Sequence, residues 1–360
     1  MAISVIQWAT GGVGQAAIQA IAAHPDLELV GCWVHSEGKV GQDAGTLAGI
    51  EPIGVPATQD VDQLLSMGAD CVVYSPLMPD EALLCRILSA GIDVVTPLGW
   101  VYPRRQDSAA LEAACAAGGS TLHGTGIHPG GITERFPLMV SALSAQITHV
   151  RAEEFSDIRT YGAPAVLRDI MLFGATPEVA RKSPMVGFLG GGFRQSISMV
   201  AHELGFALDE RAEATHEVAV ATKPIDSPMG VIEPGLVAAQ RFTWTATVEG
   251  VPVVTARVNW LMGEEHLEPA WSFGDEGERF EVEVTGDPPA LVTFKGYQPV
   301  SVEAGLARNP GIVATANHCV SAIPYVLAAE PGIKTYLDLP LVAGRAAAHL
   351  TRPAGALRTT

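Results

Sequence analysis

The chain opens with a strand, a glycine-rich turn and a helix in immediate succession. Residues 3–8 are a short apolar run typical of a buried strand, and small or apolar side chains recur at a helical spacing over 13–24. A turn in this context binds a dinucleotide because its glycines let the backbone approach the pyrophosphate, while the helix N-terminus offers N–H groups. Ala9 stands where the pattern G-x-G-x-x-G has its first glycine, and the alternative is an ordinary tight turn. The predicted cofactor contacts are Thr10, Gly11, Gly12, Val13 and Gly14.

Length and composition bound the class of protein. The 360 residues, 48% of them hydrophobic, suffice for two domains with their own cores. No apolar run reaches the roughly 20 residues of a membrane span, and the N-terminus lacks the basic region of a secretory signal. Five scattered cysteines without a C-x-x-C pair indicate a cytoplasmic protein with neither a disulfide frame nor a metal site. The net charge of −17 argues against nucleic acid or an anionic membrane as a partner.

Strands and helices alternate along residues 1–145. The predicted strands are 3–8, 27–35, 70–75, 92–96 and 120–124. The predicted helices are 13–24, 58–67, 79–90 and 107–118. This alternation predicts an α/β domain of the Rossmann type with a doubly wound parallel sheet, which binds ligands beyond the carboxyl ends of its strands.

A different pattern begins at residue 146. Apolar residues alternate over 242–248 and 254–260 on either side of Glu249-Gly250, which predicts a β-hairpin. We expect residues 146–306 to form an α+β substrate and dimerisation domain with a mainly antiparallel sheet, and 307–360 to return to the first domain. Further predicted strands are 147–157, 214–223, 278–285 and 290–295. Helices are expected at 194–208 and 307–328, with Gly190-Gly191-Gly192 as a hinge before the former.

The end of the second predicted strand bears on the choice between NAD and NADP. Rossmann domains that prefer NAD usually have an acidic residue there to bind the ribose 2′-hydroxyl, whereas this strand ends at His35. Ser36 and Lys39 follow, and they can hydrogen-bond to and neutralise a 2′-phosphate. We therefore expect NADP, while Glu37 leaves NAD possible. The alternative is a solvated turn with an incidental lysine.

Three further cofactor contacts are expected where the next strands end. Ser75-Pro76 closes the strand at 70–75, and Thr96 closes the strand at 92–96. These residues should lie on the cofactor side of the sheet, where they could contact ribose or nicotinamide. Proline and hydroxyl residues also end strands and form turns without any ligand, so both interpretations stand.

A glycine-rich loop and a tyrosine provide the candidate proton donors. Residues 124–131 carry paired glycines around His128, which allow the backbone to approach a ligand closely; Gly126 is a predicted cofactor contact. His128 could donate a proton, orient the nicotinamide amide, or simply be hydrogen-bonded within the loop. Tyr102, after the fifth strand, could act as a phenolic acid or as a pocket wall.

The substrate pocket is less clearly marked. Glu134 opens a predicted helix, where a carboxylate is stabilised by the helix dipole without any catalytic role. Apolar candidates in the second domain cannot be told from core residues, and a polar residue inside an apolar helix needs a partner of some kind. The pocket candidates are Trp100, Glu134, Tyr161, Met171, Phe173 and Asn317.

These motifs resemble a known family. Residues 8–14, 33–45 and 124–130 are similar to those of the amine dehydrogenase and 2,4-diaminopentanoate dehydrogenase family, within the dihydrodipicolinate reductase-like superfamily. The resemblance implies a Rossmann domain, an α+β second domain, NADP or NAD, and a homodimer. It also implies reversible hydride transfer between nicotinamide and a C=N or C=O carbon.

One departure from the family pattern shapes the predicted reaction. Family members with amine dehydrogenase activity carry a catalytic glutamate in the loop after the fifth strand, but residues 97–103 contain no carboxylate. We therefore expect an oxidoreductase that acts on a small, largely apolar ketone or alcohol. The first alternative is a true amine dehydrogenase whose carboxylate comes from elsewhere, such as Glu134. The second is a non-catalytic NADP-binding sensor.

Overall fold

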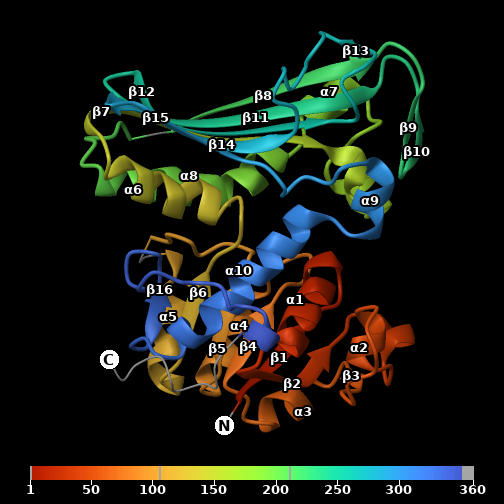
Figure 1. Ribbon diagram of the computed structural model, residues 1–360, viewed down its shortest axis with the longest axis vertical. Helices are drawn as coiled ribbons and strands as arrows, with labels where there is room; N and C mark the ends of the chain where they lie inside the picture. Colours follow the sequence, from red (N-terminus) through yellow and green to blue (C-terminus); the bar gives the residue numbers. More distant parts are fainter. Residues whose placement is uncertain (1, 105–106, 211, 351–360) are drawn as a thin grey trace. The chain divides into compact units, whose positions relative to one another are not determined.

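The computed structural model describes residues 2–104, 107–210 and 212–350 (Figure 1). Within these ranges no helix combines the length and the hydropathy needed to cross a lipid bilayer.

The chain is divided into two compact units. The first contains residues up to 126 and from 312 onwards, and the second contains residues 127–311. The sequence predicts domain boundaries at residues 145 and 306. These boundaries stay a prediction about which segments fold independently.

A parallel sheet forms the centre of the first unit. Its strands are β1 (Ile3–Trp8), β2 (Leu27–Trp33), β3 (Ala57–Thr58), β4 (Cys71–Tyr74), β5 (Asp93–Thr96), β6 (Thr121–Gly124) and β16 (Gly332–Lys334). Their order is β16-β6-β5-β4-β1-β2-β3, and every neighbouring pair is parallel. This confirms the doubly wound Rossmann-type sheet that the alternating pattern predicts.

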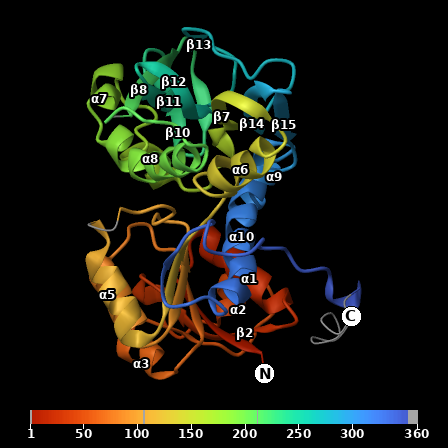
Figure 2. The same cartoon turned by 90° about the vertical axis from the view of Figure 1, so that its left-hand side faces the viewer.

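Helices cover both faces of this sheet (Figure 2). One face packs against α1 (Gly12–Ala23), α2 (Ala44–Leu47) and α10 (Pro310–Val326). The other packs against α3 (Val61–Ser66), α4 (Glu81–Ser89) and α5 (Ala109–Gly118). Val5 contributes to the first core and its neighbour Ile6 to the second, because successive side chains of a strand point to opposite faces. Burial on both sides explains why these strands are mainly apolar.

The two edge strands differ from the expectation. We expected a helix over 58–67, but Thr58 belongs to β3 and α3 begins at Val61. Asp60 sets this start, because its carboxylate accepts the N–H of Gln63 at 2.9 Å and so caps the helix. At the other edge, β16 spans only three residues, too few for a recognisable alternation.

A mixed sheet forms the second unit. Its strands are β7 (Ala145–Asp157), β8 (Glu213–Ala221), β11 (Val237–Val248), β12 (Val251–Leu261), β13 (Leu267–Glu268), β14 (Arg279–Asp287) and β15 (Ala290–Phe294). Their order is β13-β8-β11-β12-β7-β14-β15. Only the β12–β7 pair among these is parallel, which confirms the mainly antiparallel second sheet. A separate ribbon pairs β9 (Ile225–Ser227) with β10 (Gly230–Ile232).

The predicted hairpin is confirmed. Val248 of β11 faces Val251 of β12 across a two-residue turn. Glu249 and Gly250 have φ angles of 50° and 77°, and positive φ at both central positions is the turn geometry that matches the twist of the two strands.

The longest helix of the second unit differs from the expectation. The unit's α-helices include α6 (Phe136–Ser141), α7 (Pro177–Arg181), α8 (Met185–Glu203) and α9 (Val302–Ala307). We expected a helix only from residue 194, but α8 begins at Met185, so the three glycines lie inside it and form no hinge. A Cβ at Gly190 would lie 2.7 Å from Trp244 Nε1, and one at Gly192 would lie 2.8 Å from Pro129 Cγ. Close packing therefore favours glycine there and outweighs its low helix propensity.

The helix expected over 307–328 is confirmed as α10, which begins at Pro310 and ends at Val326. Proline is tolerated in the first turn of a helix, because the N–H that it lacks would have no partner there. Ala307 is instead the last residue of α9. From α10, Ala316, Cys319 and Ile323 are buried in the core of the first unit.

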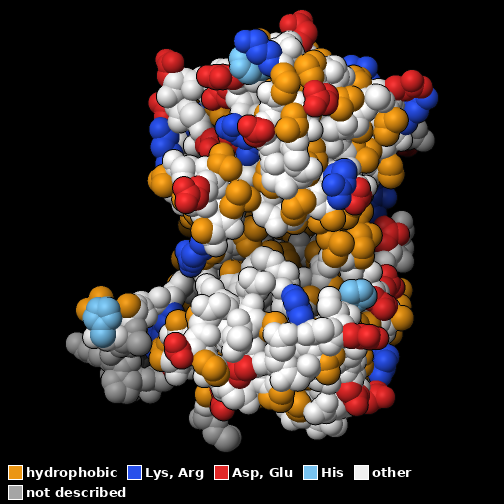
Figure 3. Space-filling model, turned by 90° about the vertical axis from the view of Figure 1, so that its right-hand side faces the viewer, with side chains coloured by type: hydrophobic (Ala, Val, Ile, Leu, Met, Phe, Trp, Pro, Cys, Tyr) orange, Lys and Arg blue, Asp and Glu red, His pale blue; other side chains and the backbone are white. Residues whose placement is uncertain are grey.

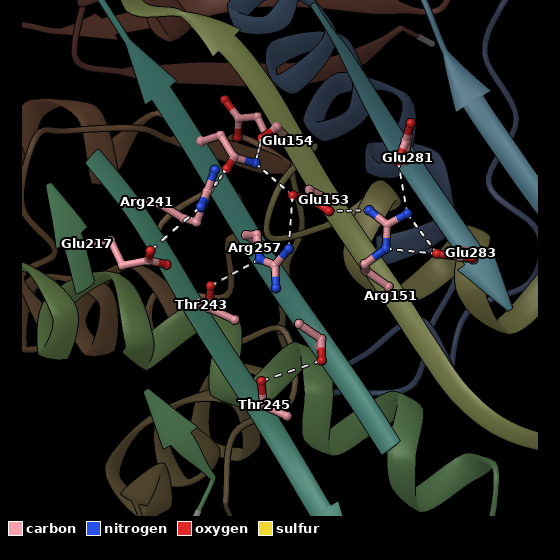
Figure 4. Close-up of polar contacts among 12 residues, drawn as sticks. Arg151, Glu153, Glu154, Glu217, Arg241, Thr243, Thr245, Arg257, Glu281 and Glu283 are labelled. Atoms are coloured by element: carbon pink, nitrogen blue, oxygen red, sulfur yellow. Dashed lines mark hydrogen bonds and ion pairs between the residues drawn. The ribbon is translucent and has the colours of Figure 1, made fainter. Parts of the chain in front are cut away.

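The face of the second sheet opposite α6 and α8 carries a network of charged side chains (Figure 4). Arg151 contacts Glu281 at 3.0 Å and Glu283 at 2.7 Å, and it also pairs with Glu153. Arg257 adds a contact of 3.5 Å to Glu153. Although Glu153 is only 4% exposed, these arginines compensate for its lost hydration.

A single carboxylate organises the segment that follows β2. The Oδ1 atom of Asp43 accepts the backbone N–H groups of Gly45, Thr46 and Ile53 at 2.8–3.2 Å. Its Oδ2 atom accepts those of Gly54 and Val55 at 2.7 and 3.1 Å. Partial burial opposes ionisation, but these N–H groups outweigh it and hold the pKa of Asp43 below its usual value.

We predict that Asp43→Asn lowers the melting temperature by about 5 °C at pH 7, because an amide NH₂ in place of Oδ2 leaves two N–H donors unpaired. Since the folded pKa is depressed, the stabilisation by the carboxylate is present above the unfolded value of about 3.9 and is lost as the pH falls below it. Thermal melts from pH 7 to pH 3 should therefore converge for the two proteins. A constant difference at every pH would contradict the electrostatic explanation.

Candidate active site

The glycine turn joins β1 to α1 by a very close contact. A Cβ at Gly14 would lie 2.1 Å from the carbonyl oxygen of Ala9, so only glycine permits this approach of helix to strand. Ala9 has a φ of 75°, the left-handed conformation that the missing first glycine of the motif would adopt without cost. The turn therefore has the fingerprint geometry despite the alanine.

The start of α1 is suited to an anion. Gly11 is the N-cap, no side chain in the described part of the chain caps the helix, and its first turn contains no acidic residue. A Cβ at Gly11 would meet none of the described atoms within 4 Å. Uncapped N–H groups at a helix N-terminus attract phosphate. The residues of this turn thus fit the pyrophosphate of a dinucleotide.

One predicted cation lies directly at the turn. Lys39 Nζ donates to Thr10 Oγ1 at 3.0 Å and to the Thr10 carbonyl oxygen at 3.3 Å. His35 and Ser36 are exposed beside it, and Ser36 precedes the short helix Glu37–Lys39. The segment after β2 thereby brings a positive charge next to the glycine turn. The role of His35, Ser36 and Lys39 in cofactor binding stays a prediction.

Gln7 is a buried member of the site that no motif singles out. Its Nε2 donates to the Ala9 carbonyl oxygen and to Ser75 Oγ, both at 2.9 Å, which ties the turn to the end of β4. The signal was present in the sequence, because a glutamine inside an apolar strand requires polar partners. Pro76 follows at the same strand end and is partly buried.

The loop after β5 packs on the end of β6. Thr96 is fully buried, and its carbonyl oxygen accepts the N–H of Thr125 at 2.8 Å. A Cβ at Gly124 would lie 1.9 Å from the Gly99 carbonyl oxygen, so this loop runs directly over Gly124. Trp100 has a φ of 56°, and Tyr102 is partly buried.

Three polar side chains meet where β6 ends. Tyr336 Oη lies 2.5 Å from Thr125 Oγ1, which lies 3.1 Å from His318 Nδ1. His318 Nδ1 also lies 2.6 Å from the Gly126 carbonyl oxygen. Asn317, the predicted pocket residue, is exposed, so its neighbour His318 makes these contacts instead.

His128 lies inside the second unit. Its ring packs against Phe193 and Phe280 at centroid distances of 4.8 and 5.7 Å, and its side chain is 1% exposed. Burial lowers the pKa of His128 to about 3, against a smaller opposing effect from the Arg257 backbone. Among the described residues, neither ring nitrogen has a partner in hydrogen-bonding geometry. At neutral pH the imidazole is therefore uncharged.

A carboxylate lies beside this ring, and the sequence motifs did not point to it. Glu154 Oε2 lies 4.0 Å from His128 Nε2, and Glu154 Oε1 accepts from Trp260 Nε1 at 2.9 Å and from Ser156 Oγ at 2.7 Å. Burial raises the pKa of Glu154, while these two donors oppose the shift. The dipeptide Glu153-Glu154 within a strand was the available signal, because two adjacent strand residues must point to opposite faces.

Glu134 is completely buried and fully engaged within the second unit. Its Oε2 accepts the Gly130 N–H at 2.7 Å and the Thr133 hydroxyl at 2.8 Å, and Oε1 accepts from the Ser196 hydroxyl. Burial raises the pKa of Glu134 to about 8, although these donors favour its ionised form. The carboxyl group therefore braces the loop and the short helix Gly131–Arg135.

The remaining pocket candidates are core residues of the second unit. Met171 and Phe173 are 6% and 1% exposed and belong to its main hydrophobic cluster, against which Tyr161 packs. Their role as pocket walls stays a prediction. Within the described ranges, no cluster of three or more metal-ligating side chains occurs. On the face shown in Figure 3, lysine and arginine side chains are scattered among acidic and apolar ones.

Two protein families match successive parts of the chain. Residues 3–75 match the dihydrodipicolinate reductase N-terminal domain, and residues 132–351 match the 2,4-diaminopentanoate dehydrogenase C-terminal domain. The chain is 33% identical to an amine dehydrogenase of Streptomyces virginiae over 94% of this chain and 96% of that protein. It is also 26% identical to a 2,4-diaminopentanoate dehydrogenase of Acetoanaerobium sticklandii, over 67% of this chain and 64% of that protein.

A solved structure has the same fold. That of an amine dehydrogenase from Mycobacterium smegmatis aligns with a TM-score of 0.76 over 95% of this chain and 97% of that one, at 22% identity. The overall fold of this chain is thus shared with that protein.

We predict that Glu134→Gln makes the protein relatively more stable as the pH rises. Because the folded pKa is raised to about 8, the contribution of Glu134 is fully present below its unfolded value of about 4.3 and is lost as the pH rises through the folded value. Glutamine does not titrate, so the variant should escape a loss on the order of 3 kcal/mol between pH 5 and pH 8. Thermal melts at both values, with Glu203→Gln on the surface of α8 as the control, measure this. Parallel pH curves for wild type and variant would contradict the assignment.

Proposed function

The chain belongs to the family of 2,4-diaminopentanoate and amine dehydrogenases, and on this premise we propose that it catalyses the reversible reduction of small, largely apolar ketones to alcohols. We further propose that it uses NADP in preference to NAD. As a member of this family it is an NAD(P)-dependent oxidoreductase. The finer assignment of substrate and cofactor is the proposal.

The proposed cofactor preference is supported by the charge beside the glycine turn. Lys39 contacts Thr10 at 3.0 Å, and Ser36 is exposed next to it. Together they form a donor pair that a 2′-phosphate can engage. When bound, the nicotinamide supplies or accepts the hydride. The chain itself holds the pyrophosphate at Gly11 and Gly12, positions the substrate and keeps water out.

The observation that carries the choice of a ketone is the composition of the loop after β5. Residues 97–103 contain no carboxylate, and Glu134 is occupied by donors from Gly130, Thr133 and Ser196. An ammonium or iminium cation in a site shielded from water needs an anion beside it, whereas a neutral ketone does not. The site supports carbonyl reduction better than ammonia activation.

A second candidate is reductive amination. The relative from Streptomyces virginiae, 33% identical over nearly the whole chain, is an amine dehydrogenase. The buried Glu154, 4.0 Å from His128, is a carboxylate that such a reaction would use in place of a glutamate in the loop after β5. This candidate predicts an absolute requirement for ammonium.

His128 and Tyr102 remain the donors predicted from the sequence. Burial favours the neutral imidazole of His128. In this form the ring can donate a hydrogen bond, but it does not carry the extra proton of an imidazolium. Tyr102 lies in the loop after β5 and is partly buried. The predicted pocket lining stays as proposed: Trp100, Glu134, Tyr161, Met171, Phe173 and Asn317.

We also infer a homodimer. The face of the second sheet with Arg151, Glu153 and Arg257 offers an extended, preorganised array of opposite charges, which suits contact with an equally polar surface of a second copy.

We expect the purified protein to oxidise NADPH in the presence of small aliphatic or cyclic ketones without added ammonium. Each ketone is tested with and without ammonium, and alcohol or amine products are identified by mass spectrometry. Turnover only with ammonium would replace the proposal by the second candidate. NADPH binding without turnover under either condition would contradict both.

The substitution Lys39→Gln should change the affinity for NADPH more than the affinity for NADH. The amide retains a hydrogen bond to Thr10 but lacks the charge that a 2′-phosphate requires, so we expect the Kd for NADPH to rise about 10- to 100-fold, with little change for NADH. Cofactor fluorescence titration measures both constants. Lys182→Gln, on the exposed surface of α7's end, is the matched control. An equal loss for both cofactors would mean that Lys39 serves the pyrophosphate instead.

A further inference from the structure

We propose that Gln7 is a positioning residue of the cofactor site, because its amide holds Ala9 in the left-handed conformation on which the phosphate turn depends. The inference rests on the binding of a nicotinamide dinucleotide at this turn, and it requires neither a ketone substrate nor a preference for NADP. It makes the affinity for the cofactor depend on a fully buried residue of β1.

The conformation of Ala9 is set by the two peptide groups that flank it, because φ and ψ describe how these planar units are rotated about Cα. The first peptide group, between Trp8 and Ala9, belongs to the parallel sheet. Its N–H donates to the Trp33 carbonyl oxygen at 3.0 Å, and its carbonyl oxygen accepts the Ser75 N–H at 3.1 Å. This group is thus held by β2 on one side and by the chain after β4 on the other.

The second peptide group, between Ala9 and Thr10, is held by Gln7. Its carbonyl oxygen, which belongs to Ala9, accepts from Gln7 Nε2 at 2.9 Å. The same amide nitrogen donates to Ser75 Oγ at 2.9 Å and contacts the Trp8 carbonyl oxygen at 3.1 Å. With both peptide groups held, Ala9 keeps its φ of 75°, a value that L-residues other than glycine rarely adopt.

The orientation of the Gln7 amide follows from its surroundings. Rotation of the amide by half a turn would place Oε1 against the carbonyl oxygens of Trp8 and Ala9, which can only accept. In the observed orientation, Oε1 is buried and has no partner among the described residues. Because an unpaired buried acceptor costs stability, we infer that the NH₂ group, rather than the oxygen, is the reason for a glutamine at this position.

The same amide contacts the start of α1. Gln7 Nε2 lies 3.0 Å from the position of a Cβ on Gly14, the residue that approaches the Ala9 carbonyl oxygen. Thr10 comes next in the chain and accepts from Lys39 Nζ through its hydroxyl and its carbonyl oxygen. A rotation at Ala9 would therefore displace both the contact with Lys39 and the N–H groups of the helix N-terminus that suit a pyrophosphate.

This arrangement explains how the fingerprint accommodates an alanine. Glycine adopts a positive φ without a steric penalty, so a fingerprint with its first glycine needs no side chain to hold it. Alanine favours a negative φ, and without Gln7 the turn would relax away from the conformation that binds the cofactor. Gln7 and Ala9 should therefore be coupled, and coupled residues respond non-additively to substitution.

The experiment measures the effect of Gln7→Met in two backgrounds, the wild type and Ala9→Gly. Methionine is similar in length to glutamine but lacks the amide. Fluorescence titration without substrate gives the Kd values of NADPH and NADH. In the wild-type background we expect both to rise about 10-fold, because alanine leaves the left-handed conformation. In the Ala9→Gly background we expect a change of less than about twofold, because glycine keeps the conformation unaided.

The matched control is Gln19→Met. Gln19 is a partly buried residue of α1, and its Nε2 donates to the Ala48 carbonyl oxygen at 2.8 Å, outside the glycine turn. It thus loses the same kind of hydrogen bond within the same unit. Both Kd values should stay at those of the wild type.

The outcomes separate a positioning role from a purely structural one. Equal losses of affinity in both backgrounds would overturn the inference, because Gln7 would then act independently of Ala9. Unchanged affinity of Gln7→Met in the wild-type background would overturn it as well. If Gln7→Met alone does not fold, a folded double variant with wild-type affinity supports the inference, whereas a double variant that is unfolded or binds weakly overturns it. Since no substrate is present, a failure of ketone reduction leaves these outcomes unaffected.

Discussion

The contact between Gly14 and the Ala9 carbonyl oxygen determines where the first helix begins. With 2.1 Å between that oxygen and a would-be Cβ, no other residue lets α1 start so close to the end of β1. The helix N-terminus is thereby aimed beyond the carboxyl edge of the sheet, and Lys39 and the Gln7–Ser75 pair are built around the same turn. The strain of Ala9 at a φ of 75° is accepted at this point, as is common where function sets the backbone.

Two carboxyl groups that are shielded from water, Asp43 and Glu134, have pKa values shifted in opposite directions. Asp43 remains ionised because five backbone N–H groups replace its hydration. Glu134 is fully buried, and burial raises its pKa to about 8 although donors that include Gly130, Thr133 and Ser196 oppose the shift. The first arrangement holds a surface segment beside the cofactor turn, and the second stabilises a loop mainly in its neutral form. Burial therefore prevails at the fully buried Glu134, whereas the N–H donors prevail at the more accessible Asp43.

Local patterns predicted much of both units from the sequence. The fingerprint, the strand alternation and the hairpin at Glu249-Gly250 each depend on neighbouring residues, so they could be read directly. The long-range contacts could not. Thr125 meets His318 across 193 residues and Tyr336 across 211, and no spacing rule connects such positions. The interpretation of the α8 glycines as a hinge was wrong for a related reason. Their packing against Trp244 and Pro129 outweighs the low helix propensity of glycine. Glu154 could have been found from its neighbour, because Glu153 and Glu154 are adjacent strand residues and must face opposite sides of the sheet.

The return of the chain to its first sheet has a consequence for how the protein is made. When the first 126 residues have left the ribosome, β1 to β6 can pair, but β16 and α10 do not yet exist. The outer edge of β6 is then an open strand, and the apolar side chains that meet Ala316, Cys319 and Ile323 face water. Open edges of this kind invite pairing with other chains. The nascent protein thus exposes an unpaired strand edge and apolar side chains until the whole second unit has been synthesised.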